Sequence, residues 1–149
     1  MALSADIVGM TYTYPDYYEI GVEKIRQYAK AVKSMDAAHF HEDAARALGY
    51  DGILAPLTFI SIFGLQAQMA FFAHAGIPIE DEKIVQVEQG LTMLHPLKAG
   101  DRLYCHIRLE SLRRAFGADV LTIRSRITNQ HGQTVQVDYT VMAGRSESE

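Results

Sequence analysis

The segment from Leu57 to Ala75 is apolar on nearly every face, and this constrains the fold more than any other feature of the sequence. Its large apolar residues are Leu57, Phe59, Ile60, Ile62, Phe63, Leu65, Met69, Phe71 and Phe72. Pro56 suits the first turn of a helix, because its missing N–H would have no partner there, and Gly76 suits a helix end. A helix that is apolar all round must be surrounded by other structure. We therefore expect a buried central helix about 28 Å long.

Four segments downstream of this helix alternate between apolar and polar residues, as strands with one buried face do. Their more apolar sets are Val85, Val87, Gln89, Leu91 and Met93; Leu103, Cys105, Ile107 and Leu109; Leu121, Ile123, Ser125 and Ile127; and Val135, Val137, Tyr139 and Val141. Turn residues separate the segments at 99–101, 116–118 and 129–132. The sequence therefore predicts a four-stranded antiparallel meander after the helix.

The first half of the chain is expected to be mainly helical. Tyr17–Ile20 is a candidate short strand, and the helical spacing of apolar residues predicts a helix over Val22–Met35. A second helical piece is expected over Glu42–Leu48, ending near Gly49. These elements leave a loop between the two helices.

The predicted elements fit one architecture of the α+β class: a curved antiparallel sheet wrapped around one long central helix. This is the hot-dog fold, and we expect residues 1–149 to form a single such domain, with residues 145–149 as a frayed tail. A sheet of this kind leaves an edge strand open in a monomer. Pairing two copies, or two related chains, covers that edge, so we expect a homodimer or a heterodimer.

Composition excludes several classes of protein. The net charge of -4 argues against a nucleic-acid-binding protein, and the only cysteine, Cys105, argues for a reducing cytoplasm. The segment 56–79 contains Gln66, Gln68 and His74 and is too polar to indicate a membrane span. The cluster around His39 and His41 lacks an established ligand spacing, so we expect no metal site.

The loop between the two predicted helices contains Asp36 and His41, five positions apart. This spacing resembles the G-D-x-N-P-x-H loop of the MaoC-like (R)-hydratase and dehydratase family, in which the Asp and the His are catalytic. Met35 stands in place of the Gly, and Ala38 and His39 stand in place of the Asn and the Pro. The resemblance implies that Asp36 and His41 are catalytic and that the protein acts on acyl thioesters.

A closer resemblance spans nearly the whole chain. The segments 1–10, 23–26, 54–59, 84–87 and 99–101 look like those of HadA/HadC-type subunits of mycobacterial (3R)-hydroxyacyl-ACP dehydratase. The resemblance implies a role in elongating fatty acids of the mycolic-acid type. It also implies a heterodimer in which a HadB-type partner carries the standard Asp–His loop and this chain shapes the acyl channel. An alternative function is therefore a non-catalytic, acyl-chain-binding subunit.

The residues themselves suit the dehydration of a 3-hydroxyacyl thioester carried on CoA or an acyl carrier protein, with no cofactor. Histidine is a common general base, so His41 can remove the C2 proton, and Asp36 can orient water or supply a proton. The backbone N–H groups of Leu57 and Thr58, at the predicted helix N-terminus, can stabilise the enolate oxygen.

Three alternatives stay open beside this interpretation. Phe59 and Phe63 are candidates for the acyl pocket, but they are first of all candidates for the core. Asp36 could simply cap the following turn, and His41 could open a surface helix. A hot-dog thioesterase is disfavoured, because the segment Leu57–Ala75 contains no Asp or Glu that could activate water.

Overall fold

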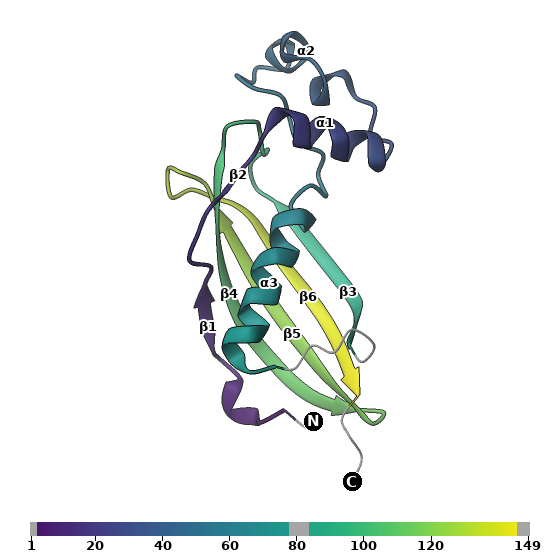
Figure 1. The fold of residues 1–149 in the computed structure, drawn as a ribbon, viewed down its shortest axis with the longest axis vertical. Helices are drawn as coiled ribbons and strands as arrows, with labels where there is room; N and C mark the ends of the chain where they lie inside the picture. The colour runs from purple at the N-terminus through teal and green to yellow at the C-terminus, as the bar shows by residue number, and fades with distance from the viewer. Residues whose placement is uncertain (1–2, 78–83, 146–149) are drawn as a thin grey trace.

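A long antiparallel sheet curves around one helix, α3, in the computed structural model, which describes residues 3–77 and 84–145 (Figure 1). The elements in chain order are η1 (Ala5–Ile7), β1 (Thr11–Thr13), β2 (Tyr18–Glu19), α1 (Val22–Ala31), η2 (Ala37–His39), α2 (Glu42–Ala47), α3 (Ser61–Ala75), β3 (Ile84–Met93), β4 (Arg102–Ala115), β5 (Ala118–Thr128) and β6 (Thr134–Arg145). The expected α+β hot-dog fold is confirmed.

The sheet has the strand order β1-β4-β5-β6-β3, with β2 also pairing with β4, and every pairing is antiparallel. β3 therefore lies at one edge, beside β6, although it precedes β4 in the chain. Its pairing with β6 shifts between Gln86 and Glu88, which makes Val87 an extra residue. Such a bulge lets residues three apart, Gln86 and Gln89, face the same side of the sheet.

Four phenylalanines fix α3 and its first turn against the sheet: Phe59, Phe63, Phe71 and Phe72 are each no more than 1% exposed. They share one core with sheet residues such as Leu103 and Ile123. Burying a side chain of this size contributes about 1.5–3 kcal/mol. The central position predicted for this helix is thus confirmed, and its packing provides the main core of the molecule.

Two features of α3 differ from the prediction. The regular helix begins at Ser61, because the residues before it form tight turns in which Phe59 N donates to Pro56 O (2.9 Å) and Ser61 N to Thr58 O (3.0 Å). The helix is also not surrounded, since Leu65 is 62% exposed. One apolar face of α3 therefore remains uncovered in the protomer.

The prediction for the buried face of β6 holds at Val135, which is buried, and is wrong beyond it. Gln136, Asp138 and Thr140 are buried, whereas Val137 and Tyr139 are only partly buried. Alternation identifies a strand but does not say which side faces the core. The inward polar residues of β6 are important below, because they lie opposite α3.

The predicted buried faces are confirmed for β4 and β5. Leu103, Cys105, Ile107 and Leu109 of β4, and Leu121, Ile123, Ser125 and Ile127 of β5, are all buried. The predicted strand near Tyr17 is present as β2. The prediction for β3 was wrong in part, because Val85 and Val87 are both more than half exposed.

The first helix ends earlier than predicted, at Ala31 rather than Met35. Lys33 has a positive φ of 59°, and Ser34 N donates to Ala29 O (2.9 Å), which is a left-handed C-terminal cap. α2 ends near Gly49, as predicted, and Gly49 has a φ of 90°. The expected frayed tail began at residue 145, but Arg145 is the last residue of β6, and residues 146–149 lie outside the described residues. No helix in the described ranges is long and apolar enough to cross a membrane.

Tyr139 covers Gly90 on the outer face of the sheet. The two residues are direct partners between β6 and β3, and a Cβ at Gly90 would lie 2.0 Å from Tyr139 Cε1. The hydroxyl of Tyr139 donates to Glu88 Oε1 (2.7 Å). An aromatic ring over a strand glycine fixes the register of the edge strand.

We expect Gly90→Ala to lower the free energy of unfolding by about 1–3 kcal/mol, because the ring of Tyr139 must move away. Gly64→Ala in α3 is the matched control, since nothing lies within 4 Å of its added Cβ. The control should be unchanged or gain about 0.5–1 kcal/mol from helix propensity. Urea unfolding of the three proteins measures both effects, and equal stability of Gly90→Ala and wild type would contradict the packing described.

Candidate functional site

The helices α1, η2 and α2 form a cap beyond the front end of α3 (Figure 1). Two hydrogen bonds from the guanidinium of Arg26 to Phe40 O (3.2 and 3.0 Å) hold α1 against the loop 36–41. Leu54 N donates to Ala38 O (3.0 Å), and Leu54 O lies 2.7 Å from His39 Nδ1. The loop is thereby attached to the segment that leads into α3.

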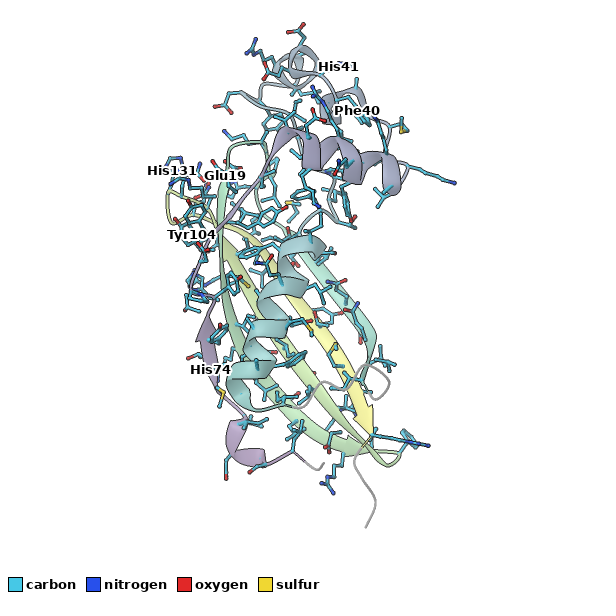
Figure 2. The ribbon with its side chains drawn as sticks, viewed as in Figure 1. Glu19, Phe40, His41, His74, Tyr104 and His131 are labelled. Atoms are coloured by element: carbon cyan, nitrogen blue, oxygen red, sulfur yellow. The ribbon has the colours of Figure 1, made fainter. Side chains whose placement is uncertain are left out.

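The structure places both predicted catalytic residues at the surface of this cap. Asp36 Oδ1 accepts from Ala38 N (2.9 Å) and so caps η2. His41 precedes α2 and is exposed, and Figure 2 shows it beside α2 rather than at α3. Within the described part of the chain, no hydrogen bond joins the two side chains. The capping role considered for Asp36 is present, and catalysis by the pair stays a prediction.

His39 has a structural role in the same loop. Its ring lies between Leu54 O and Ser34 Oγ, at 2.7 Å from Nδ1 and 3.1 Å from Nε2. Both ring nitrogens are therefore engaged. His39 holds the loop in place, whereas the imidazole of His41 has no hydrogen bond to any of the described residues.

The front of α3 presents the two backbone N–H groups that the sequence singled out. Leu57 and Thr58 are exposed, and among the described residues no group accepts a hydrogen bond from either N–H. Tyr28 of α1 positions this turn: its hydroxyl donates to Thr58 O (2.9 Å) and lies 2.7 Å from Thr58 Oγ1. The ring of Tyr28 packs edge-on against Phe59. This turn can therefore offer donors to an oxyanion.

Phe59 and Phe63 lie in an aromatic cluster of the core. The ring of Tyr18 stacks on Phe63 at 5.5 Å, and Tyr14 meets the same ring edge-on at 5.5 Å. Neither phenylalanine lines the pocket described below. Their core role is observed, and their contact with an acyl chain stays a prediction.

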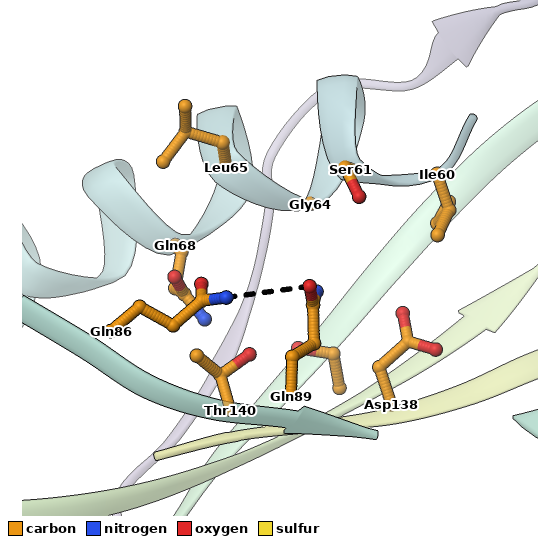
Figure 3. A pocket seen from close by; sticks show the side chains of 10 residues that line it. Ile60, Ser61, Gly64, Leu65, Gln68, Gln86, Gln89, Asp138 and Thr140 are labelled. Carbon is orange, nitrogen blue, oxygen red and sulfur yellow. Dashed lines mark hydrogen bonds between the residues drawn. The ribbon is translucent and has the colours of Figure 1, made fainter. Parts of the chain in front are cut away.

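A pocket of about 210 Å³ lies between α3 and the concave face of the sheet (Figure 3). Its lining residues come from four elements and the turn before α3: Ile60, Ser61, Gly64, Leu65, Gln68, Gln86, Gln89, Ser125, Asp138 and Thr140. Most of these side chains are polar. The alternation of residues in β6 does not reveal this pocket, because it does not say which face of the strand lies under α3.

The floor of the pocket contains a buried carboxyl group. Asp138 is 6% exposed, lies opposite Ser125 in the sheet and accepts from Gln136 Nε2 (2.9 Å). Burial raises the pKa of Asp138 to about 6, and the hydrogen bond from Gln136 opposes that rise. Burial likewise raises the pKa of the neighbouring Cys105 thiol to about 12, so the thiol is a structural group and not a nucleophile.

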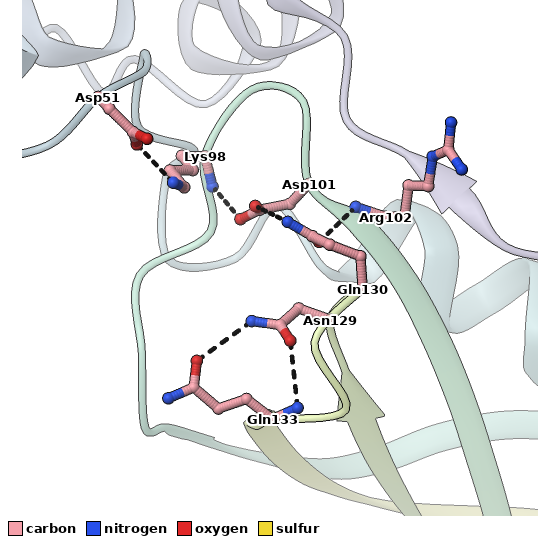
Figure 4. A network of polar contacts seen from close by, with 7 residues as sticks. All are labelled: Asp51, Lys98, Asp101, Arg102, Asn129, Gln130 and Gln133. Carbon is pink, nitrogen blue, oxygen red and sulfur yellow. Dashed lines mark hydrogen bonds and ion pairs between the residues drawn. The ribbon is translucent and has the colours of Figure 1, made fainter.

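The turns before β4 and β6 carry a network of polar contacts (Figure 4). Asp101 is buried and accepts from Lys98 N and from Gln130 Nε2, both at 3.1 Å. Lys98 also forms an ion pair with Asp51, which lies in the segment before α3. The network connects the turn before β4, the turn before β6 and the approach to α3. In the described ranges, no three His, Cys, Asp or Glu side chains gather to hold a metal ion.

Comparison with known proteins identifies the family. A family model described as the FAS1-like dehydratase domain region matches residues 6–137. The chain belongs to this dehydratase family. It is 53% identical over 146 residues to a UPF0336 protein of Mycobacterium tuberculosis, covering 98% of this chain and 92% of that protein.

Solved structures of dehydratases share the fold. A chain of the HadBC (3R)-hydroxyacyl-ACP dehydratase complex of Mycobacterium tuberculosis is 42% identical, with a TM-score of 0.86, covering 95% of this chain and 100% of that chain. A MaoC-like dehydratase is 32% identical, with a TM-score of 0.85, covering 95% of this chain and 43% of that longer chain. The predicted family resemblance is confirmed.

Removing the hydroxyl of Tyr28 tests the positioning of the front turn. If the turn at Thr58 binds the thioester, Tyr28→Phe should lower kcat/KM for hydration of an enoyl thioester about tenfold, because Thr58 loses both of its hydrogen bonds to the cap. Tyr12→Phe is the matched control, since Tyr12 in β1 packs against His74 near the other end of α3. An equal effect of the two substitutions on hydration kinetics would contradict a positioning role for Tyr28.

The raised pKa of Asp138 predicts a pH-dependent stability. The folded state binds this proton more tightly than the unfolded chain, whose Asp pKa is near 3.8, so Asp138 lowers stability as the pH rises from about 4 to about 6. Asp138→Asn removes this cost, and we expect it to raise the free energy of unfolding at neutral pH by about 1–3 kcal/mol. Urea unfolding at about pH 7.5 and about pH 4 tests this, because the gain should vanish at the lower pH. A gain of equal size at both pH values would assign it to another cause.

Proposed function

We propose that this chain is a subunit of a (3R)-hydroxyacyl-thioester dehydratase, which also hydrates the corresponding enoyl thioester, and that it works paired with a second hot-dog chain. The observation that carries this proposal is the 42% identity, over 95% of the chain, to a chain of the HadBC (3R)-hydroxyacyl-ACP dehydratase complex. The substrate is an acyl thioester of CoA or of an acyl carrier protein, in elongation of the mycolic-acid type. A cytoplasmic location remains a prediction.

An uncovered surface on one side of the protomer supports the pairing. It consists of the free edge of β3 and the exposed residues Leu65, Met69, Val85 and Val87. Leu65 lines the same pocket as Gln86 and Gln89 of β3, so the exposed face of α3 adjoins this edge. A long edge strand with apolar neighbours is typical of a surface that pairs with another chain. A HadB-type subunit is the partner that we propose.

The reaction requires a base, an acid and a donor for the thioester oxygen. The base removes the C2 proton, the thioester oxygen becomes an enolate oxygen, and the C3–O bond breaks as the hydroxyl leaves as water. We assign the enolate contact to the N–H groups of Leu57 and Thr58, which lie at the front of α3 with no internal acceptor in the described chain. His41 is the candidate base of this chain, and Asp36 is the candidate for orienting the water.

The positions of Asp36 and His41 favour an alternative assignment of the catalytic acid and base. Asp36 uses one carboxyl oxygen to cap η2, and His41 is exposed beside α2 without a hydrogen-bond partner among the described residues. In this alternative, a HadB-type partner supplies the acid and the base, and this chain binds the substrate. Both alternatives predict the same product from the assembled pair.

Hydration of an enoyl-CoA, followed by loss of its ultraviolet absorbance, tests the proposal. We expect the chain together with a HadB-type subunit to hydrate trans-2-enoyl-CoA. The chain alone should be inactive if Asp36 and His41 are not catalytically competent. No hydration by the chain alone or by the pair would contradict the proposed function.

His41→Ala in the assembled pair then separates the two divisions of labour. Removal of a general base should lower kcat about 100-fold or more if His41 is catalytic. An activity that survives the substitution assigns the chemistry to the partner. His131→Ala, in the exposed turn before β6, is the matched control and should leave the rate unchanged in either case.

A further inference from the structure

The concave face of the sheet is polar where the pocket separates it from α3. Ser125, Asp138 and Thr140 are each less than 10% exposed, yet they line the pocket rather than pack against apolar side chains. From α3, Ser61 and Gly64 face the same space and present little bulk. The sheet and the helix thus leave a polar cavity within an otherwise apolar interface.

One hydrogen bond joins residues that line this cavity, from Gln86 Nε2 to Gln89 Oε1 (3.4 Å). Asp138 accepts a hydrogen bond from Gln136, which lies outside the lining and whose Oε1 is buried without a partner among the described residues. Gln68 is 7% exposed and lines the cavity. A buried polar group without a hydrogen bond costs about 1–3 kcal/mol, so a cavity of this composition suits a ligand that can donate and accept hydrogen bonds.

The position of the cavity relates it to the acyl chain of the proposed substrate. The cavity begins at Ile60, two residues after Thr58, whose N–H is assigned to the thioester oxygen. It follows α3 from Ser61 to Gln68, about 10 Å at the helical rise. An acyl chain that runs from that thioester along α3 meets Asp138 and Thr140. A plain alkyl chain there would bury a carboxyl group against methylenes, which is unfavourable.

We propose, on the basis of the function proposed above, that this pocket selects acyl chains that carry a hydroxyl group, which donates its proton in a hydrogen bond to Asp138. Thr140 and Ser125 lie beside Asp138 on the pocket floor, and the amides of Gln68 and Gln89 can contact the hydroxyl oxygen. The substrate class is then an oxygen-substituted acyl thioester rather than a plain one.

Paired substrates test this selectivity in the chain assembled with its HadB-type partner. The reference is trans-2-decenoyl-CoA, and the analogues carry one hydroxyl, placed in turn at each carbon from the fifth to the last. We expect at least one analogue to be hydrated with a kcat/KM about tenfold higher than that of the reference, as one hydrogen bond to a carboxylate provides. Asp138→Leu should abolish this preference, so that the analogue and the reference are hydrated with equal kcat/KM.

Two further variants keep the result interpretable. Thr128→Val replaces another buried polar residue of β5 that does not line the pocket, and it should retain the preference. Thr140→Val changes the pocket floor without changing its volume, and it should reduce the preference even if Asp138→Leu fails to fold. Circular dichroism and the melting temperature establish that each variant is folded.

The outcomes separate this inference from the proposed function. If the reference is hydrated at least as well as every analogue, or if the preference survives both floor substitutions, the inference is overturned and the dehydratase function stands. If Asp138→Leu impairs crotonyl-CoA as much as the long substrates, the pocket holds the carrier arm, and the inference is again overturned. If no enoyl-CoA is hydrated at all, the proposed function fails, and this inference fails with it.

Discussion

The packing of the α3 phenylalanines into the concave sheet is the interaction on which the remaining structure depends. Phe59, Phe63, Phe71 and Phe72 are fully buried, and four side chains of this size together contribute an amount comparable with the net stability of a whole domain. Since this contact fixes the helix, it also fixes the turn at Thr58, to which Tyr28 attaches the cap. The position of every candidate site residue follows from it.

A polar cavity beside this core lowers the free energy of unfolding, so the retention of its buried groups requires an explanation. Asp138 would be more stable at neutral pH in water than under α3, as the raised pKa shows. Proteins retain buried groups of this kind mostly where they serve binding or chemistry. The concave face of this sheet therefore combines two environments: apolar residues that hold the helix, and the polar residues of the pocket to which we assign the acyl hydroxyl.

Sequence patterns predicted the elements well and their orientation less well. The apolar segment before Gly76 could only be a central helix, and β4 and β5 bury the residues that their alternation indicated. For β6 the same pattern misled, because Val137 and Tyr139 are apolar but lie outside, with Tyr139 over Gly90. The candidate site shows the same difference. The loop at Asp36 is predicted as catalytic from its spacing alone, whereas the pocket at Asp138 depends on which face of a strand is buried, which local sequence does not determine.

The free edge of β3 has a consequence for how the protein is made. A chain released from the ribosome without its counterpart exposes an open strand with Val85 and Val87 beside an apolar helix face, which is the geometry that favours aggregation. Matched synthesis of this chain and the partner proposed above would remove that hazard. An excess of this chain would then accumulate without a partner and become a substrate for chaperones and proteases.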